Sequence, residues 1–417
     1  SAFQGRERGT AFGVWGAVTG LATAVGPVVG GALTSGLSWR WIFLVNVPIG
    51  IVAVVLTQLR VQESRQQGQR RIDPLGVITF SGALGALVLA LIEADRRGWG
   101  STYILSLLAG AAAGMLAFLA VEFLQPERAM FDLRLFRKPT FVGGSLAAFS
   151  LSAGFFALFL YLTLYLQDVL GYSPMQTGLR FLVLSGGIML SSTAAGRLTA
   201  RVPIRLLIAP GLALVGAGLL LMSGLNASTH WTHLIPGFIV GGIGVGMINP
   251  PLASTAIGVV EPARAGMASG INSTFRQVGI ATGIAGLGAL FTHSVSVHIE
   301  SLLNGVRSLP RGAAGRIAHA VSQGGGARSG LSHVPQAARA AVDHAVRGGF
   351  TQGLNEVFLV GAILSFASAF LVFFLIRTRD FEASAARGGA TQARPQEERG
   401  MAGASEDGAP AQAPSAG

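Results

Sequence analysis

Arg276 is a charged residue inside an apolar stretch. It lies about ten residues into the run that begins near Gly266, beside Gln277, and no acidic residue is close to it in the sequence. An ionisable group inside such a span is costly, so it usually faces protein or water and is a candidate for function. We predict a gating or pairing role for Arg276 and Gln277. The alternative is that Arg276 lies close enough to the cytoplasmic face for its guanidinium to reach water.

Aromatic side chains in the middle of the chain are candidates for contact with an organic compound. Their rings suit flat, cationic or lipophilic compounds, which they hold by stacking and by cation–π contacts. The alternative, for each ring, is that it faces lipid or belongs to the aromatic belt at a membrane interface. The candidates are Phe155, Phe156, Phe159, Tyr161, Tyr165 and, as a small polar residue, Asn249.

Residues that would support enzymatic chemistry are missing from the sequence. It has no cysteine, no histidine-rich cluster, no nucleophile motif and no pair of catalytic carboxylates. The glycine run from Gly241 to Gly246 lies inside an apolar stretch, which favours helix packing over nucleotide binding. We expect a protein that is not an enzyme and that uses no cofactor and no metal.

The composition indicates that lipid surrounds the elements that must position these residues. Of 417 residues, 51% are hydrophobic, only 12% are charged and 59 are glycine, which is unlike an ordinary soluble domain. The net charge of +11 comes from arginines in short loops, so we expect it to set membrane topology and not to bind nucleic acid. Because backbone groups in lipid must pair within their own segment, the predicted fold class is an all-α polytopic membrane protein.

Apolar stretches of roughly 20 residues, the length that crosses the hydrocarbon core, recur along the chain. Short polar breaks separate them, and several contain Gly or Pro, which membrane helices tolerate. Ten transmembrane helices are predicted, at residues 10–35, 41–59, 74–93, 102–124, 140–167, 174–199, 203–224, 232–256, 266–292 and 354–376.

Basic residues are concentrated in alternate loops, which predicts an orientation. One set of loops contains most of them, whereas the opposite short loops hold Arg40, Arg96 and Arg97. Since cytoplasmic loops retain more arginine and lysine, both ends of this chain are predicted to be cytoplasmic.

Two segments lie outside the predicted spans. The long loop 294–353 is expected on the external side, with short surface helices between Ala313 and Val346 on either side of a glycine run. The tail 381–417 has almost no large apolar residue, so it is expected to be disordered.

Small residues form a stripe along the first predicted span. Such a stripe lets a facing helix approach closely, although any membrane helix can be rich in glycine. The stripe consists of Gly13, Gly26, Pro27, Gly30 and Gly31. A second pattern follows after a short turn, in the run from Ser38 to Gly50. Its marked residues are Trp39, Arg40, Trp41, Asn46 and Pro48.

The two patterns together resemble those of a known family. The spacing from Gly13 to Gly31 resembles the antiporter motif in the fifth helix of major facilitator superfamily exporters, with Ala22 where that motif usually has glycine. The run from Ser38 to Gly50 looks like the junction into the sixth helix of the fourteen-helix drug:proton antiporter branch. The stretch Asp132 to Arg137 is similar to the entry to the carboxy-terminal bundle of that branch, and Gly266 to Gly279 is similar to its thirteenth helix.

The resemblance covers residues 1 to about 380 and implies an architecture. The ten spans would correspond to helices 5 to 14, which implies an amino-terminal truncation of four helices. Residues 1–60 would hold the last two helices of the amino-terminal bundle, 61–139 an inserted helix pair with cytoplasmic linkers, 140–380 the six-helix carboxy-terminal bundle, and 381–417 the tail.

The resemblance also implies a function. It implies a secondary active transporter in the bacterial cytoplasmic (inner) membrane, whose partners are the lipid bilayer, protons and a small-molecule substrate. Drugs or other small organic compounds would be exported in exchange for protons by alternating access. The proton-carrying acid would lie in the missing helices. Two alternatives stay open, namely an exporter of a specific metabolite, siderophore or peptide, and a fragment that does not transport.

Overall fold

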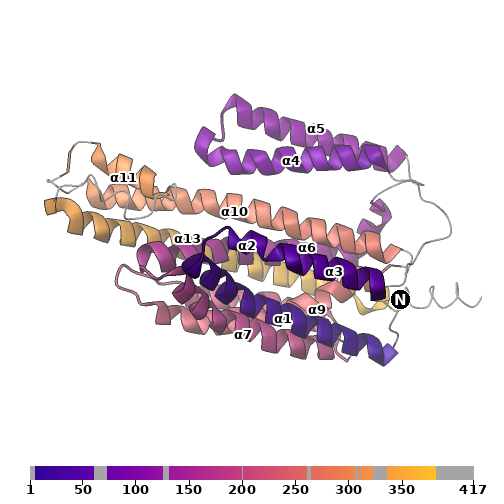
Figure 1. Cartoon of the computed structure of the whole chain (residues 1–417). Helices are drawn as coiled ribbons and strands as arrows, with labels where there is room; N and C mark the ends of the chain where they lie inside the picture. The colour runs from indigo at the N-terminus through magenta and orange to yellow at the C-terminus, as the bar shows by residue number, and fades with distance from the viewer. Residues whose placement is uncertain are drawn as a thin grey trace, which may run out of the picture.

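Long apolar runs form helices in the computed structural model of the chain (Figure 1). A helix pairs backbone N–H and C=O groups within one segment, which lipid requires because it offers no other partner. The structure describes residues 5–60, 73–124, 131–199, 201–260, 264–304, 306, 309–310, 312–322 and 336–381. The predicted disordered tail therefore lies outside the described residues beyond Phe381.

Ten helices within these described ranges are long and apolar enough to cross a membrane. This confirms the prediction of an all-α polytopic membrane protein. The spanning helices are α1 (Gly5–Gly36), α2 with α3 (Trp41–Leu44 and Asn46–Arg60), α4 (Pro74–Arg97), α5 (Thr102–Leu124), α6 (Pro139–Leu164) with the π-helical turn η2 (Tyr165–Val169), α7 (Pro174–Leu198), α8 (Arg205–Met222), α9 (Ile235–Gly258), α10 (Ala265–Leu303) and α13 (Arg339–Leu375). The shorter elements are η1 (Leu133–Arg137), η3 (Trp231–Leu234), α11 (Ala313–Ser322) and η5 (Gln336–Ala338).

Local sequence signals start two of the spanning helices. The carboxylate of Asp73 accepts a hydrogen bond of 2.8 Å from the backbone N–H of Gly76, and Pro74 occupies the first turn of α4. Ser173 and Gln176 form a capping box at the start of α7. Because these starts depend on neighbouring residues alone, they agree closely with the predicted spans.

Two helices run beyond their predicted spans. α10 continues to Leu303 and α13 begins at Arg339, so the predicted loop 294–353 is helical at both of its ends. The physical reason is that polar residues end a membrane span without ending a helix. Residues 294–303 contain no Pro, so every residue there has the backbone N–H that the hydrogen bonds of α10 need. α11 confirms a short helix inside the loop.

Six helices, α6 to α10 and α13, pack around one hydrophobic core. Glycines allow close approach: a Cβ added at Gly211 would lie 2.7 Å from a side-chain carbon of Ile248, between α8 and α9. The other helices attach to this core from outside. α1 packs along α7, and the α4–α5 hairpin lies beside α10 (Figure 1). α3 buries none of its residues against the described part of the chain.

Polar contacts fasten the segment before α6 to one end of the six-helix core. Asp132 forms an ion pair with Arg264, which directly precedes α10. The Lys138 ammonium donates to the carbonyl oxygen of Val259, which follows α9. The Thr140 hydroxyl donates to the carboxylate of Asp380 at 2.5 Å. The ends of α6, α9, α10 and α13 are thereby tied together.

Candidate functional site

A cavity of about 480 Å³ lies between α1 and the six-helix core. α1 forms one wall, and α6, α7, α9 and α10 form the others. Its lining residues are Trp15, Thr19, Ala22, Thr23, Gly26, Pro27, Leu151, Ser152, Phe155, Phe159, Leu184, Ser185, Ile188, Val245, Asn249 and Arg276. The lining is apolar with a small number of polar groups, which is typical of small-molecule sites.

Several residues predicted from the sequence meet at this cavity. They come from four helices and from both halves of the chain, so only the folded structure brings them together. They are Gly26 and Pro27 of α1, Phe155 and Phe159 of α6, Asn249 of α9 and Arg276 of α10.

The two tyrosines predicted to contact a substrate do not line the cavity. The Tyr161 ring lies against Phe291 of α10, with 4.6 Å between centroids, and its hydroxyl faces the carbonyl of Ile284. Tyr165 is buried, and its hydroxyl donates to the carbonyl of Thr229 at 3.3 Å. Both hydroxyls thus have partners inside the bundle, as buried tyrosines usually do, and substrate contact by these two residues stays a prediction. Both tyrosines connect helices and loops of the six-helix core.

Three further candidates also lie outside the cavity lining. Gln277 is exposed on α10, although its neighbour Arg276 faces the cavity. Adjacent residues point about 100° apart around a helix, and here Gln277 lies on the side of α10 that faces away from the cavity. Gly13 lies in α1 and Phe156 in α6, but the surroundings of both lie outside the described part of the structure.

Glycines bring the backbones of α1 and α7 into contact. A Cβ added at Gly20 would lie 2.6 Å from the Cα of Met189, and one at Gly31 would lie 2.6 Å from the carbonyl oxygen of Pro174. A Cβ added at Gly178 of α7 would in turn clash with the carbonyl oxygen of Pro27. Real Cβ atoms do not approach so closely, so only glycine allows this packing.

The predicted glycine stripe is therefore partly wrong. A Cβ added at Gly26 or Gly30 would meet nothing within 4 Å. Gly26 faces the cavity instead, while Gly16, which the stripe did not include, lies against α7. The hydroxyl of Ser192 donates to the Gly16 carbonyl at 3.1 Å. The face of α1 that contacts α7 thus includes Gly16, Gly20 and Gly31. The sequence motif alone did not show which side of α1 this face occupies.

The second sequence pattern forms the turn between α1 and α3. Arg40 lies 5.8 Å from the centroid of the Trp39 ring, and Trp39 meets Phe43 edge-on at 6.1 Å. The Asn46 amide donates to the carbonyl of Ile42 at 2.8 Å. These contacts are local.

The remaining residues of this pattern belong to the two short helical segments. Trp41 starts α2, and Pro48 lies in the first turn of α3. The pattern Trp39, Arg40, Trp41, Asn46 and Pro48 therefore shapes a helix junction and contributes nothing to the cavity lining.

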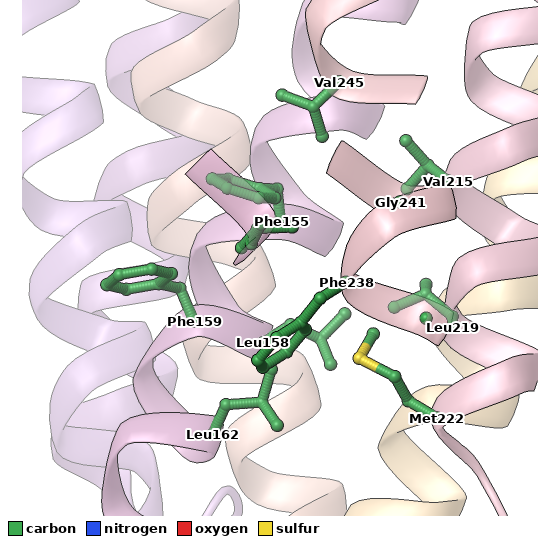
Figure 2. Close-up of a pocket in the computed structure, with 12 residues that line it drawn as sticks. Phe155, Leu158, Phe159, Leu162, Val215, Leu219, Met222, Phe238, Gly241 and Val245 are labelled. Atoms are coloured by element: carbon green, nitrogen blue, oxygen red, sulfur yellow. The ribbon is translucent and has the colours of Figure 1, made fainter. Parts of the chain in front are cut away.

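Phe155 and Phe159 separate the cavity from a second, smaller pocket of about 30 Å³ (Figure 2). The two spaces also share Leu184 and Val245. Figure 2 shows the phenyl rings on one side of this pocket, with Phe238, Leu219 and Met222 on the other. Its lining contains no polar side chain.

Arg276 is the one ionisable side chain among the described lining residues. It makes no ion pair or hydrogen bond to another described residue. Ser152 is 1% exposed, and its hydroxyl oxygen has no hydrogen-bond partner in the described part of the chain. The Asn249 amide also lines the cavity and has no partner in the described part of the chain. The cavity therefore offers one cationic and one neutral hydrogen-bonding group that other described residues do not use.

Several residues of this site were not predicted from the sequence. The small polar residues Ser152 and Ser185 gave no signal, because hydroxyls in membrane helices usually bond to their own backbone. The guanidinium of Arg180 in α7 lies 3.4 Å from the centroid of the Tyr172 ring and 5.0 Å from that of the Trp231 ring. Arg180 is not part of the cavity lining.

Comparison with known proteins gives a family match. The family model described as Major Facilitator Superfamily matches residues 1–284 of the chain. The chain is 38% identical to the puromycin resistance protein pur8 of Streptomyces alboniger over 304 residues, which cover 70% of this chain and 59% of that protein. It is 36% identical over 312 residues to the multidrug resistance protein Stp of Mycobacterium tuberculosis, covering 74% and 56%.

A third relative is more distant. The chain is 28% identical over 310 residues to the multidrug transporter protein MdtP of Bacillus subtilis, covering 74% of this chain and 57% of that protein. The chain thus spans less than two thirds of the length of each of these relatives.

Proposed function

The chain belongs to the Major Facilitator Superfamily, and from this premise we propose that it serves the efflux of drugs or other small organic compounds. Its ten apolar helices make it a multi-pass membrane protein. The three relatives above are named for resistance or for multidrug transport, and these names support export as the direction of transport.

The observation that carries the proposal is the cavity between α1 and the six-helix core. Its volume of about 480 Å³ lies within the range of small-molecule sites, roughly 300–1,000 Å³. Since α1 attaches to the core from outside, movement of one against the other would expose the cavity first to one side of the membrane and then to the other. Such alternating access is the transport mechanism we propose.

Proton coupling and the position within the family are further parts of the proposal. The ten helices would be helices 5 to 14 of the fourteen-helix drug:proton antiporter branch. The described cavity lining contains no carboxylate, so we propose no residue of this lining as the proton carrier. We propose the bacterial cytoplasmic membrane as the location, with both ends of the chain on the cytoplasmic side.

A second candidate is the export of one specific compound. It is supported by the name of the Streptomyces alboniger relative, which refers to a single antibiotic. A metabolite, a siderophore or a peptide would then be the cargo. The cavity is compatible with both candidates, because its polar groups are few.

A vesicle assay separates the two candidates. The full coding region, including any sequence upstream of Ser1, and the present chain alone are expressed separately in a bacterial strain without its main efflux pumps. Proton release from inverted vesicles is then measured after addition of a panel of unrelated compounds. Multidrug export predicts release with several compounds, whereas specific export predicts release with one.

The same assay includes control samples, and one of its outcomes would contradict the proposed function. We expect the present chain alone to be inactive, because α1 is the only described helix that closes the cavity from its side. Arg276→Ala in the full-length protein should abolish transport without preventing membrane insertion, which is checked by quantifying the protein in the membrane fraction. If vesicles that contain the product of the full coding region release protons in response to none of the compounds, the proposed efflux function is wrong.

A further inference from the structure

The charge of the cavity lining points to the kind of compound that the site accepts. Arg276 is the only ionisable group among the described lining residues, and it makes no contact with an acid in the described part of the chain. A cationic compound would meet this guanidinium without any carboxylate to offset the repulsion. A compound with an acidic oxygen would instead form a charge-assisted hydrogen bond, which is stronger than a neutral one.

A neutral donor accompanies Arg276. The amide of Asn249 lines the same cavity and has no partner in the described part of the chain. It can therefore donate a hydrogen bond to a bound acceptor, which contributes about 1 kcal/mol. The serine hydroxyls are less available: that of Ser152 is buried without a partner, as are those of Ser145 and Ser294, whereas that of Ser191 donates to the carbonyl of Gly187 at 2.7 Å.

The polar and aromatic residues lie at different levels of the cavity. α6 and α10 run parallel, because Gly279 lies against Phe149, Gly283 against Ala153 and Gly288 against Tyr161.

The level of each lining residue follows from these contacts. The backbone of Arg276 lies about one turn before Gly279 in α10. In α6, Phe155 and Phe159 follow Phe149 by six and ten residues. At 1.5 Å per residue, the two rings lie about 13 and 20 Å further along the helix axes than the Arg276 backbone. The extended arginine side chain and a bound aromatic compound together span such a distance.

The aromatic level is suited to an uncharged ring system. Phe159 stacks on Phe181 with 4.3 Å between centroids, so its own position is held by a neighbour. Behind Phe155 and Phe159 lies the small pocket without polar side chains (Figure 2). An apolar substituent can enter this space at little cost, whereas a charged one would lose its hydration without compensation.

From these features we propose that the cargo is an amphipathic organic acid. Its carboxylate, sulfonate or other acidic oxygen binds Arg276, with the Asn249 amide as a hydrogen-bond donor, and its flat ring system lies against Phe155 and Phe159. This inference rests on the proposed efflux function and narrows its substrate class. The sequence suggested flat, cationic or lipophilic compounds for the aromatic residues; this inference keeps a flat, lipophilic ring system and replaces the cationic group by an acidic one.

Two fluorescent probes that differ by one acidic group test the inference. 8-Anilinonaphthalene-1-sulfonate and N-phenyl-1-naphthylamine share the same rings, and only the first carries a sulfonate. Saturable binding of each is measured to the full-length protein in lipid nanodiscs, with empty nanodiscs subtracted. We expect Arg276→Gln to weaken binding of the sulfonate about tenfold, as for loss of a hydrogen bond to a charged group. Binding of the uncharged probe should change less than about twofold.

Matched variants separate recognition from charge and folding. Arg197→Gln removes an exposed arginine of α7 outside the cavity and should leave both probes unchanged. Arg276→Lys should retain part of the preference for the sulfonate. If Arg276→Gln does not fold, Asn249→Ala gives an independent test, with an expected loss of about threefold for the sulfonate alone.

Three results would overturn the inference. They are equal weakening of both probes by Arg276→Gln, unchanged or tighter binding of the sulfonate in that variant, and the absence of saturable sulfonate binding to the unaltered protein. Tighter binding would mean that Arg276 pairs with an acid from another segment. In the vesicle assay, proton release only with cationic or neutral compounds would reject this inference but not the proposed efflux function. Release with none of the compounds would reject the efflux function itself.

Discussion

α1 and α3 are both apolar spans, and they behave differently in the structure. α1 lies against α7 with Gly20 and Gly31 at backbone contact distance. α3 is the more apolar of the two, yet it buries no residue against the described part of the chain. In a membrane, lipid solvates apolar side chains as well as protein does, so apolarity alone does not drive helices together. Small residues and hydroxyls are the better indicators of contact.

The largest effect is expected from filling the contact between α1 and α7. In Gly20→Leu the new Cβ would lie 2.6 Å from the Cα of Met189, so the two backbones must separate. Overpacking of this kind costs about 3 kcal/mol. We expect a clear fall in the thermal unfolding temperature of the purified protein and loss of export.

Gly30→Leu is the matched control on the same helix. It makes the same chemical change at a position where an added Cβ meets nothing within 4 Å. Its unfolding temperature should stay close to that of the unaltered protein. Equal destabilisation by both variants would show that helix flexibility, and not the contact with α7, explains the cost.

A smaller effect is expected from the hydroxyl that joins the same two helices. Ser192→Ala removes the 3.1 Å hydrogen bond to the carbonyl of Gly16. Hydrogen bonds between membrane helices contribute about 0.6 kcal/mol on average. The loss should be measurable as a modest fall in the unfolding temperature in nanodiscs.

Thr57→Ala on α3 provides the comparison for this hydrogen bond. The Thr57 hydroxyl donates at 2.8 Å to Ala53 of its own helix, so its loss removes no contact between helices. We expect no detectable change in stability. A loss as large as that of Ser192→Ala would mean that local bonds matter as much as those between helices.

The smallest effect is expected from truncating an exposed side chain of α3. Leu56 is 53% exposed in the described structure, so in Leu56→Ala lipid tails would fill most of the space that the leucine side chain occupied. The change in unfolding free energy should stay below about 0.5 kcal/mol. A loss of several times that size would show that α3 packs against a further segment, which would remove the contrast with α1.

The spans could be predicted from the sequence because lipid imposes a length and a composition on them. Signals such as Asp73 with Pro74 set a helix start through neighbouring residues alone. The ends of α10 and α13 could not be predicted in the same way, since a helix continues past the point where its residues become polar. α10 shows this, because it continues through several glycines and residues 294–303 contain no Pro that would interrupt it.

The site could be predicted only in part, because residue types do not reveal which face of a helix they occupy. Arg276 was identified by its charge and lies at the cavity, whereas Gln277 beside it does not. Phe159 and Tyr161 are two positions apart, and only the phenylalanine lines the cavity. Ser152 lines the cavity and carried no signal at all, because a serine in an apolar span does not show which face of its helix it occupies.

The contact between α1 and α7 also has a mechanical consequence. Helices that interlock by large side chains must withdraw each knob from its hole before they can shift. At Gly20, Gly31 and Gly178 the surfaces that meet are backbone atoms, which present a nearly smooth track. We expect such a track to resist separation, because its close contact gives dispersion attraction along its length. It should resist sliding much less. We therefore expect α1 and α7 to shift along each other more easily than they separate.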